Sequence, residues 1–167
     1  MADYSFVTHW RIEAPIDRVW DALYRSEDWP TWWRGVLRVQ VLQPGDDQGL
    51  GTVRRFTWKS VLPYELIFDA RTTKIDKPHV LEAYASGELT GTGRWHLEQE
   101  AGVTHVRYDW NVRTTKPWMN LLAPLLRPAF AWNHDKIMGW GAVGLSRHLG
   151  ARGCASADQA DGPPDTD

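Results

Sequence analysis

The chain has 167 residues, 43% of them hydrophobic and 24% charged, which suits one domain with a substantial core. Its formal net charge is -2 with both signs scattered along the sequence, which excludes the clustered basic face of a nucleic-acid-binding domain. Neither a membrane-length apolar run nor a basic amphipathic segment is present in the sequence, so stable membrane insertion is not expected.

Cysteine and histidine usage narrows the chemistry further. The one cysteine, Cys154, cannot form an internal disulfide, so the fold does not depend on oxidation. The first residues, Met1-Ala2-Asp3-Tyr4, lack the basic and then apolar regions of a signal peptide, and we expect a cytoplasmic protein. The six histidines are dispersed, so we expect no metal site and no cofactor.

Tryptophan is the unusual feature of the composition, with 11 residues in the chain. Trp offers a large contact area with few rotatable bonds, and its indole stacks on flat molecules. Some of these side chains are expected to fill a core, and others to line a cavity.

The N-terminal part of the chain predicts one strand and two helices. Residues 4–13 alternate between a mostly apolar face and a polar one, which is typical of a strand. Pro15 suits the first turn of a helix that ends near Arg25. Ser26 is able to cap a second, short helix, which stops at Gly35.

The middle of the chain predicts six strands joined by short turns, and such short connections favour antiparallel neighbours. The predicted strands are residues 36–42, 51–60, 64–75, 80–85, 89–98 and 103–114.

A long helical pattern follows at residues 118–149. Pro124 and Pro128 are expected to kink or interrupt its first part. Gly141 and Gly144 are poor helix formers, and we expect them to allow close approach of the helix to the sheet.

The domain is predicted to end near residue 150. Residues 151–167 are rich in Ala, Gly, Asp and Pro without periodicity, and they are predicted to form a disordered polar tail. Residues 1–150 therefore form the expected domain.

The order of elements predicts an α+β helix-grip fold. A curved antiparallel sheet of about seven strands is expected to wrap around the long C-terminal helix, with two short helices after the first strand. A sheet with one face in water needs cover on the other face, and only the last helix is long enough to supply it. Such an arrangement leaves an apolar pocket with a few polar groups.

Five segments carry a resemblance to a known superfamily: Ala14-Pro15-Ile16-Asp17-Arg18-Val19-Trp20-Asp21-Ala22-Leu23, Trp29-Pro30-Thr31-Trp32-Trp33, Gly91-Thr92-Gly93-Arg94-Trp95-His96-Leu97, Val103-Thr104-His105-Val106-Arg107-Tyr108 and Gly144-Leu145-Ser146-Arg147-His148-Leu149. They resemble the START-like, or Bet v 1-like, superfamily (SRPBCC), and most closely its polyketide cyclase/dehydrase and lipid-transport branch. The resemblance implies the fold but leaves the function open, because members include lipid carriers, aromatase/cyclases, co-chaperones and toxins.

Two polar residues in the middle of the long helix are the leading candidates for chemistry. Asn133 and His134 lie within about 60° of the centre of the apolar stripe by the helical period. A polar side chain facing a cavity needs a partner. A ligand carbonyl or hydroxyl, or a bound water, is one candidate partner. The other reading is that these side chains bond to the sheet backbone or reach solvent. His148, at the helix end, is expected to pack at the rim.

The strand patterns add further candidates. Tyr108 and Trp110 share a face that should point inward. Arg54 shares a face with Phe56 and Trp58. An inward arginine either pairs with a charge such as a ligand carboxylate or lies near the sheet edge, where water reaches it. The resemblance implies that Trp32 and Trp33 lie near the cavity entrance, with one of the two in the core. The predicted ligand-binding residues are Trp32, Phe56, Trp58, Tyr108, Trp110, Phe130, Asn133, His134 and Ile137.

Carboxylates are weaker candidates. Glu65, Asp69 and Glu88 would act as general bases only if they faced inward, where burial raises a carboxyl pKa. The pattern favours the solvated face of the sheet for all three.

These observations support three functional hypotheses. The first is a binding module for a small hydrophobic or aromatic molecule, either a lipid or a polyketide-like compound. The second is a polyketide aromatase/cyclase or dehydratase that uses His134, Tyr108 and Asn133 in the same cavity. The third is an interaction module of the co-chaperone or toxin kind, which predicts a filled interior and an exposed patch. The expected state is a monomer or a homodimer.

Overall fold

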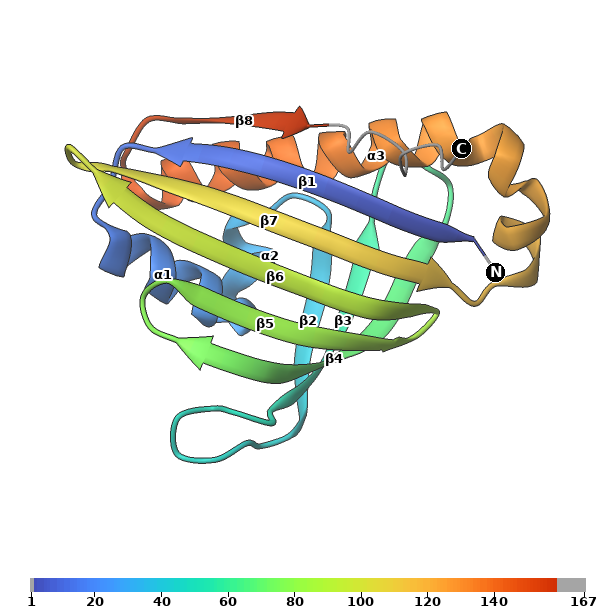
Figure 1. The fold of residues 1–167 in the computed structure, drawn as a ribbon, viewed down its shortest axis with the longest axis horizontal. Helices are drawn as coiled ribbons and strands as arrows, with labels where there is room; N and C mark the ends of the chain where they lie inside the picture. Colours follow the sequence, from blue (N-terminus) through green and yellow to red (C-terminus); the bar gives the residue numbers. More distant parts are fainter. Residues whose placement is uncertain (1, 159–167) are drawn as a thin grey trace, which may run out of the picture.

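A computed structural model describes residues 2–158 and contains one antiparallel sheet gripping a long helix (Figure 1). The strands are β1 (Asp3–Ile12), β2 (Val36–Gln43), β3 (Val53–Lys59), β4 (Glu65–Asp76), β5 (Val80–Gly87), β6 (Leu89–Glu100), β7 (Val103–Thr114) and β8 (Gly153–Asp158). The helices are α1 (Ile16–Tyr24), the 3₁₀ helix η1 (Ser26–Asp28), α2 (Trp29–Trp32) and α3 (Pro117–Leu149). The predicted α+β helix-grip fold is confirmed.

The sheet runs in the order β2-β3-β4-β5-β6-β7-β1-β8. Figure 1 shows the curved sheet on one side of α3, with α1 near one end of the sheet and the first part of α3 at the other. The alternation read in β1 and β7 is confirmed at their pairing, where Trp10 faces Val106 and Phe6 faces Trp110. This register places two aromatic strand faces side by side beneath the helix.

The eighth strand differs from the sequence-based prediction. The segment from residue 151 was expected to be disordered, but β8 pairs with β1, with Ala155 opposite Trp10. Its small and polar residues have no strand periodicity of their own. They form a strand because β1 presents unpaired backbone groups at that edge of the sheet. The remainder of the predicted tail, residues 159–167, lies outside the described residues.

The long helix is continuous despite its prolines. Pro124 and Pro128 both lie inside α3, where each removes a backbone hydrogen bond. Figure 1 shows the first part of α3 turned away from the axis of the remainder, as the predicted kink requires. The helix ends at Gly150, whose φ of 64° is left-handed and whose N–H bonds to the carbonyls of Ser146 and Arg147.

The two helical glycines allow two different close contacts. A Cβ on Gly141 would lie 2.5 Å from the indole of Trp33 and 2.7 Å from that of Trp10 in β1, so this glycine brings α3 against the sheet, as predicted, and also against Trp33. A Cβ on Gly144 would overlap the carbonyl oxygen of Trp32. The prediction that Gly144 faces the sheet is therefore wrong, because its partner is the backbone of α2.

Alanine at Gly144 tests this contact. We expect Gly144→Ala to lower the free energy of unfolding by about 1–3 kcal/mol, because the helix must move off α2 to make room for the methyl group. Gly139→Ala in the same helix is the control, since its Cβ would meet no atom within 4 Å. Removing that glycine should raise stability by up to about 1 kcal/mol. Equal urea-unfolding midpoints for the two variants would contradict the close contact.

Candidate functional site

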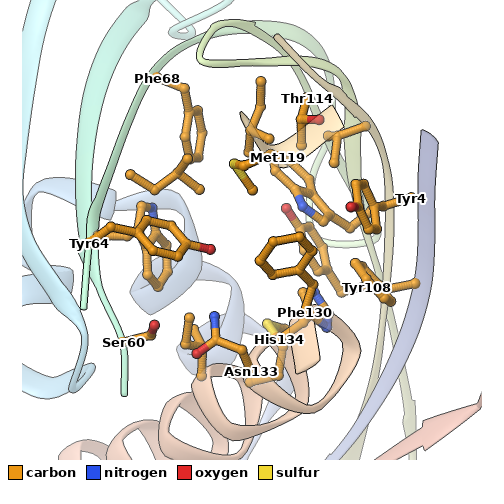
Figure 2. Close-up of a pocket in the computed structure, with 18 of the residues that line it drawn as sticks. Tyr4, Ser60, Tyr64, Phe68, Tyr108, Thr114, Met119, Phe130, Asn133 and His134 are labelled. Atoms are coloured by element: carbon orange, nitrogen blue, oxygen red, sulfur yellow. The ribbon is translucent and has the colours of Figure 1, made fainter. Parts of the chain in front are cut away.

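The main cavity lies between the inner face of the sheet and α3 and has a volume of about 140 Å³ (Figure 2). Five of the 11 tryptophans line it: Trp29, Trp33, Trp58, Trp95 and Trp110. Aromatic and aliphatic side chains from β1, β3, β4, β6, β7 and α3 complete most of the wall. The predicted hollow beneath the helix is therefore present.

Seven of the nine predicted ligand-binding residues meet at this cavity. They are Trp58, Tyr108, Trp110, Phe130, Asn133, His134 and Ile137. Their role in binding stays a prediction. Tyr4 and Phe6 also line the cavity and were not singled out, although the alternation of the first strand already placed both on its apolar face. Tyr64, the first residue of the predicted strand 64–75, also lines the cavity and was not singled out; in the structure it lies immediately before β4.

A second cavity of about 90 Å³ lies beside the first. Phe56 lines this second cavity and not the main one. Six side chains line both cavities, and we call them the aromatic wall: Trp29, Trp58, Phe68, Trp95, Tyr108 and Trp110. The aromatic wall therefore lies between the two cavities.

Trp32 does not lie where the resemblance implied. It lines neither of these two cavities, and its ring stacks on Trp33 and on His148, with centroids 5.5 Å and 5.9 Å away. The short α2 turns this indole toward the C-terminal end of α3, while Trp33 takes the inward position. Trp33 is fixed there because its Nε1–H donates to the carbonyl of Ile137 at 2.9 Å.

Four polar atoms around the main cavity are buried without a hydrogen-bond partner in the described part of the chain: Tyr4 Oη, Trp58 Nε1, Asn133 Oδ1 and His134 Nδ1. Asn133 Oδ1 and His134 Nδ1 therefore do not reach the sheet backbone. The His134 ring stacks on Phe6 with centroids 4.4 Å apart. Its Nδ1 lies 3.8 Å from a carboxylate oxygen of Asp135, too far for a hydrogen bond.

Arg54 faces inward but is paired. Its guanidinium lines the second cavity, with Nε 3.3 Å from a carboxylate oxygen of Glu27 and Nη1 3.5 Å from the Thr72 hydroxyl. Of the two readings of this arginine, the inward one agrees with the structure, and a protein carboxylate already supplies its counter-charge.

The carboxylates considered as bases lie away from the cavities. Asp69 forms an ion pair with Arg55 at 2.7 Å, and Glu88 forms one with Lys116 at 2.8 Å. Glu65, Asp69 and Glu88 line neither the main nor the second cavity. Proton transfer in the main cavity would therefore fall to its histidine and tyrosines.

The cavity tyrosines keep their protons at neutral pH. Burial raises the pKa of Tyr64 to about 12, with a smaller contribution from the neighbouring Tyr4. Burial also raises the pKa of Tyr108 far above its ordinary value. Both phenols are therefore hydrogen-bond donors rather than bases under physiological conditions.

Among residues 2–158, no helix combines the length and apolar character needed to cross a bilayer. The same residues contain no group of three or more His, Cys, Asp or Glu side chains arranged to hold a metal ion.

Sequence comparison assigns the family. Residues 4–139 match the family described as polyketide cyclase / dehydrase and lipid transport. The match covers most of the chain, and the protein belongs to this family. No protein of curated function has a matching sequence.

Solved structures share the fold at low sequence identity. The Zhui aromatase/cyclase from a Streptomyces species aligns with a TM-score of 0.73 and 14% identity, over 89% of this chain and 94% of that one. TTHA0849 from Thermus thermophilus gives a TM-score of 0.71 and 17% identity, over 87% and 97% of the two chains. A START superfamily protein from Mycobacterium smegmatis gives 0.69 and 12%, over 89% and 97%.

The raised pKa of Tyr64 predicts a loss of stability in alkali. Above the ordinary value of 10.0 the phenol ionises in the unfolded chain, whereas in the folded chain it stays protonated up to about pH 12. The contribution of the buried, protonated phenol to the free energy of unfolding is therefore fully present below about pH 10 and is lost as the pH rises towards 12. Tyr64→Phe cannot ionise, so its free energy of unfolding should fall less steeply than that of the wild type in urea titrations across this range. Parallel curves would contradict burial of the phenol.

Proposed function

We propose that the protein binds a small hydrophobic or aromatic molecule in the main cavity. The observation that carries the proposal is an aromatic-lined space of about 140 Å³ beneath α3. An apolar cavity of about 150 Å³ accommodates one benzene ring, so the space suits a compact molecule. Ligand binding inside a helix-grip domain is also in keeping with the family.

The size of the cavity bears on the ligand class. Small-molecule pockets usually have volumes of about 300–1,000 Å³. A lipid chain or a polycyclic compound would have to displace the aromatic wall and occupy the second cavity as well. The geometry therefore favours a small aromatic molecule over a lipid.

Location and assembly remain proposals of the same kind. We propose a cytoplasmic protein, because Cys154 is an exposed free thiol and such thiols persist in reducing compartments. We propose a monomer or a homodimer. The interaction-module hypothesis expects a filled interior and receives no support from the two cavities.

A cavity-filling variant tests the binding proposal. Ile137→Phe adds volume to a side chain that lines the main cavity. It should weaken binding of toluene at least about tenfold, because the added ring competes for the space that toluene would fill. Val143→Phe, on an exposed position of the same helix, is the matched control and should change nothing. Quenching of tryptophan fluorescence by the probe measures both affinities. No response to any aromatic or acyl probe would overturn the proposal.

Catalysis in the same cavity is the second candidate. It is supported by His134, whose Nδ1 has no hydrogen-bond partner, and by Tyr108 and Asn133 on the same cavity wall. An aromatase/cyclase or dehydratase needs such groups to orient a substrate and to move protons. The raised pKa of Tyr108 gives it the role of hydrogen-bond donor.

Two substitutions test the catalytic candidate. His134→Ala and Tyr108→Phe should each lower cyclisation or dehydration of a short polyketide analogue by about 10²–10⁴-fold, the usual contribution of a proton-transfer group. Steady-state assays of product formation measure the effect. Unchanged turnover in both variants would exclude these residues from catalysis.

A further inference from the structure

The main cavity has a polar end and an apolar end. Figure 2 shows Ser60, Asn133 and His134 together at one end, next to α3, with Phe68 and Met119 at the opposite end. The hydroxyl groups of Tyr4 and Tyr64 project into the space from opposite walls. A ligand that fits both ends must itself be apolar at one end and polar at the other.

The polar end contains groups that are not satisfied by the protein. Asn133 Oδ1 and His134 Nδ1 are buried there and have no partner among the described residues, and the same holds for Tyr4 Oη and Trp58 Nε1 elsewhere on the cavity wall. A buried polar group without a partner destabilises the folded protein, so a ligand that supplies the partner gains affinity. The Thr114 hydroxyl, on the same cavity, differs because it donates to Asn120 Oδ1 at 2.7 Å. Asn133 and His134 are thus open to a ligand, whereas the Thr114 hydroxyl is already satisfied.

The chemical types of these groups define what a ligand must offer. An amide oxygen such as Asn133 Oδ1 only accepts a hydrogen bond, while the tyrosine hydroxyls both donate and accept. One hydroxyl group on the ligand would donate to Asn133 Oδ1 and, in the tautomer that carries the proton on Nδ1, accept from His134. A plain hydrocarbon would satisfy neither, and an ether would only accept.

The volume sets the size of the apolar part. About 140 Å³ leaves room for one six-membered aromatic ring with small substituents. The aromatic wall borders this space, and its members Phe68, Tyr108 and Trp110 provide flat faces for a ring. A second fused ring would collide with that wall.

We propose that the ligand is a monocyclic phenol, with its ring against the aromatic wall and its hydroxyl at Asn133 and His134. This inference rests on the proposed function and narrows it to one chemical class. It also separates this protein from a carrier of long acyl chains, because such chains offer no hydrogen-bond donor at the buried end.

Three matched probes test the hydroxyl in the wild-type protein. p-Cresol, toluene and 4-methylanisole share one ring and one methyl group and differ in the hydroxyl. p-Cresol should bind at least about tenfold more tightly than either of the others, since only its hydroxyl donates to the buried amide oxygen. Isothermal titration calorimetry measures the three dissociation constants. Equal affinities for p-cresol and toluene would overturn the inference.

A pair of variants locates the interaction. Asn133→Leu keeps the side-chain size and removes the acceptor, and it should reduce the preference for p-cresol over toluene to less than about threefold. Thr115→Val removes a hydroxyl that lies outside both cavities and is hydrogen-bonded to the Gly87 carbonyl, and it should leave the preference intact. A preference unaffected by Asn133→Leu would overturn the assigned position. If that variant does not fold, the three probes on the wild type still decide the question.

Ring size gives an independent test. 2-Naphthol should bind more weakly than p-cresol, although it has more apolar surface, because its second ring meets the aromatic wall. Tighter binding of 2-naphthol would overturn the one-ring limit. Binding of toluene without a preference for p-cresol would leave the proposed function standing and end the phenol inference, whereas failure of every aromatic and acyl probe would end both.

Discussion

The contact between α3 and the tryptophans near α2 determines where space is left in the molecule. At Gly141 and Gly144 the helix lies so close to Trp10, Trp33 and the Trp32 carbonyl that no side chain fits between them. One to three turns earlier, the helix presents Phe130, Asn133 and Ile137 to an open cavity instead. The helix is therefore held against the sheet and α2 near its C-terminal end, and it stands off from the sheet towards its N-terminal end. The cavity is a direct consequence of this difference along one helix.

The aromatic wall gives the cavity its second constraint. Its rings touch one another, with Trp95 stacked on Tyr108 at 4.0 Å and Phe68 tilted against Trp110 at 5.6 Å. Interiors packed at this density resist small displacements, because moving one ring disturbs its neighbours. The wall therefore limits the main cavity to a compact volume while leaving a smaller space behind it. The size of the main cavity therefore depends on rings rather than on the backbone.

The sequence predicted those features that follow from a repeat period. Alternation in β1 and β7 correctly gave the inward faces, so Tyr108 and Trp110 were placed on the cavity side. Helical spacing correctly brought Asn133, His134 and Ile137 to the face of α3 that meets the sheet. These patterns work because a strand or a long helix repeats its direction many times.

The residues whose positions were predicted wrongly lie where the periodicity of the sequence gives too little information. Helix α2 has only four residues, so spacing could not decide whether Trp32 or Trp33 points inward. Phe56 was assigned to the correct face of its strand, but a face does not say which of two adjacent cavities a side chain reaches. Strand β8 depends on the free edge of β1, a tertiary feature absent from the local sequence of residues 153–158.

The density of indoles has an optical consequence. Trp33 lies within 5.5 Å, centroid to centroid, of Trp10, Trp29, Trp32 and Trp58. Chromophores at such separations couple excitonically and exchange excitation energy before they emit. The ultraviolet circular dichroism of this protein should therefore contain exciton bands superimposed on the backbone signal, and its helix content cannot be taken directly from that spectrum. By the same coupling, a change beside any one of these rings alters the emission of the whole group.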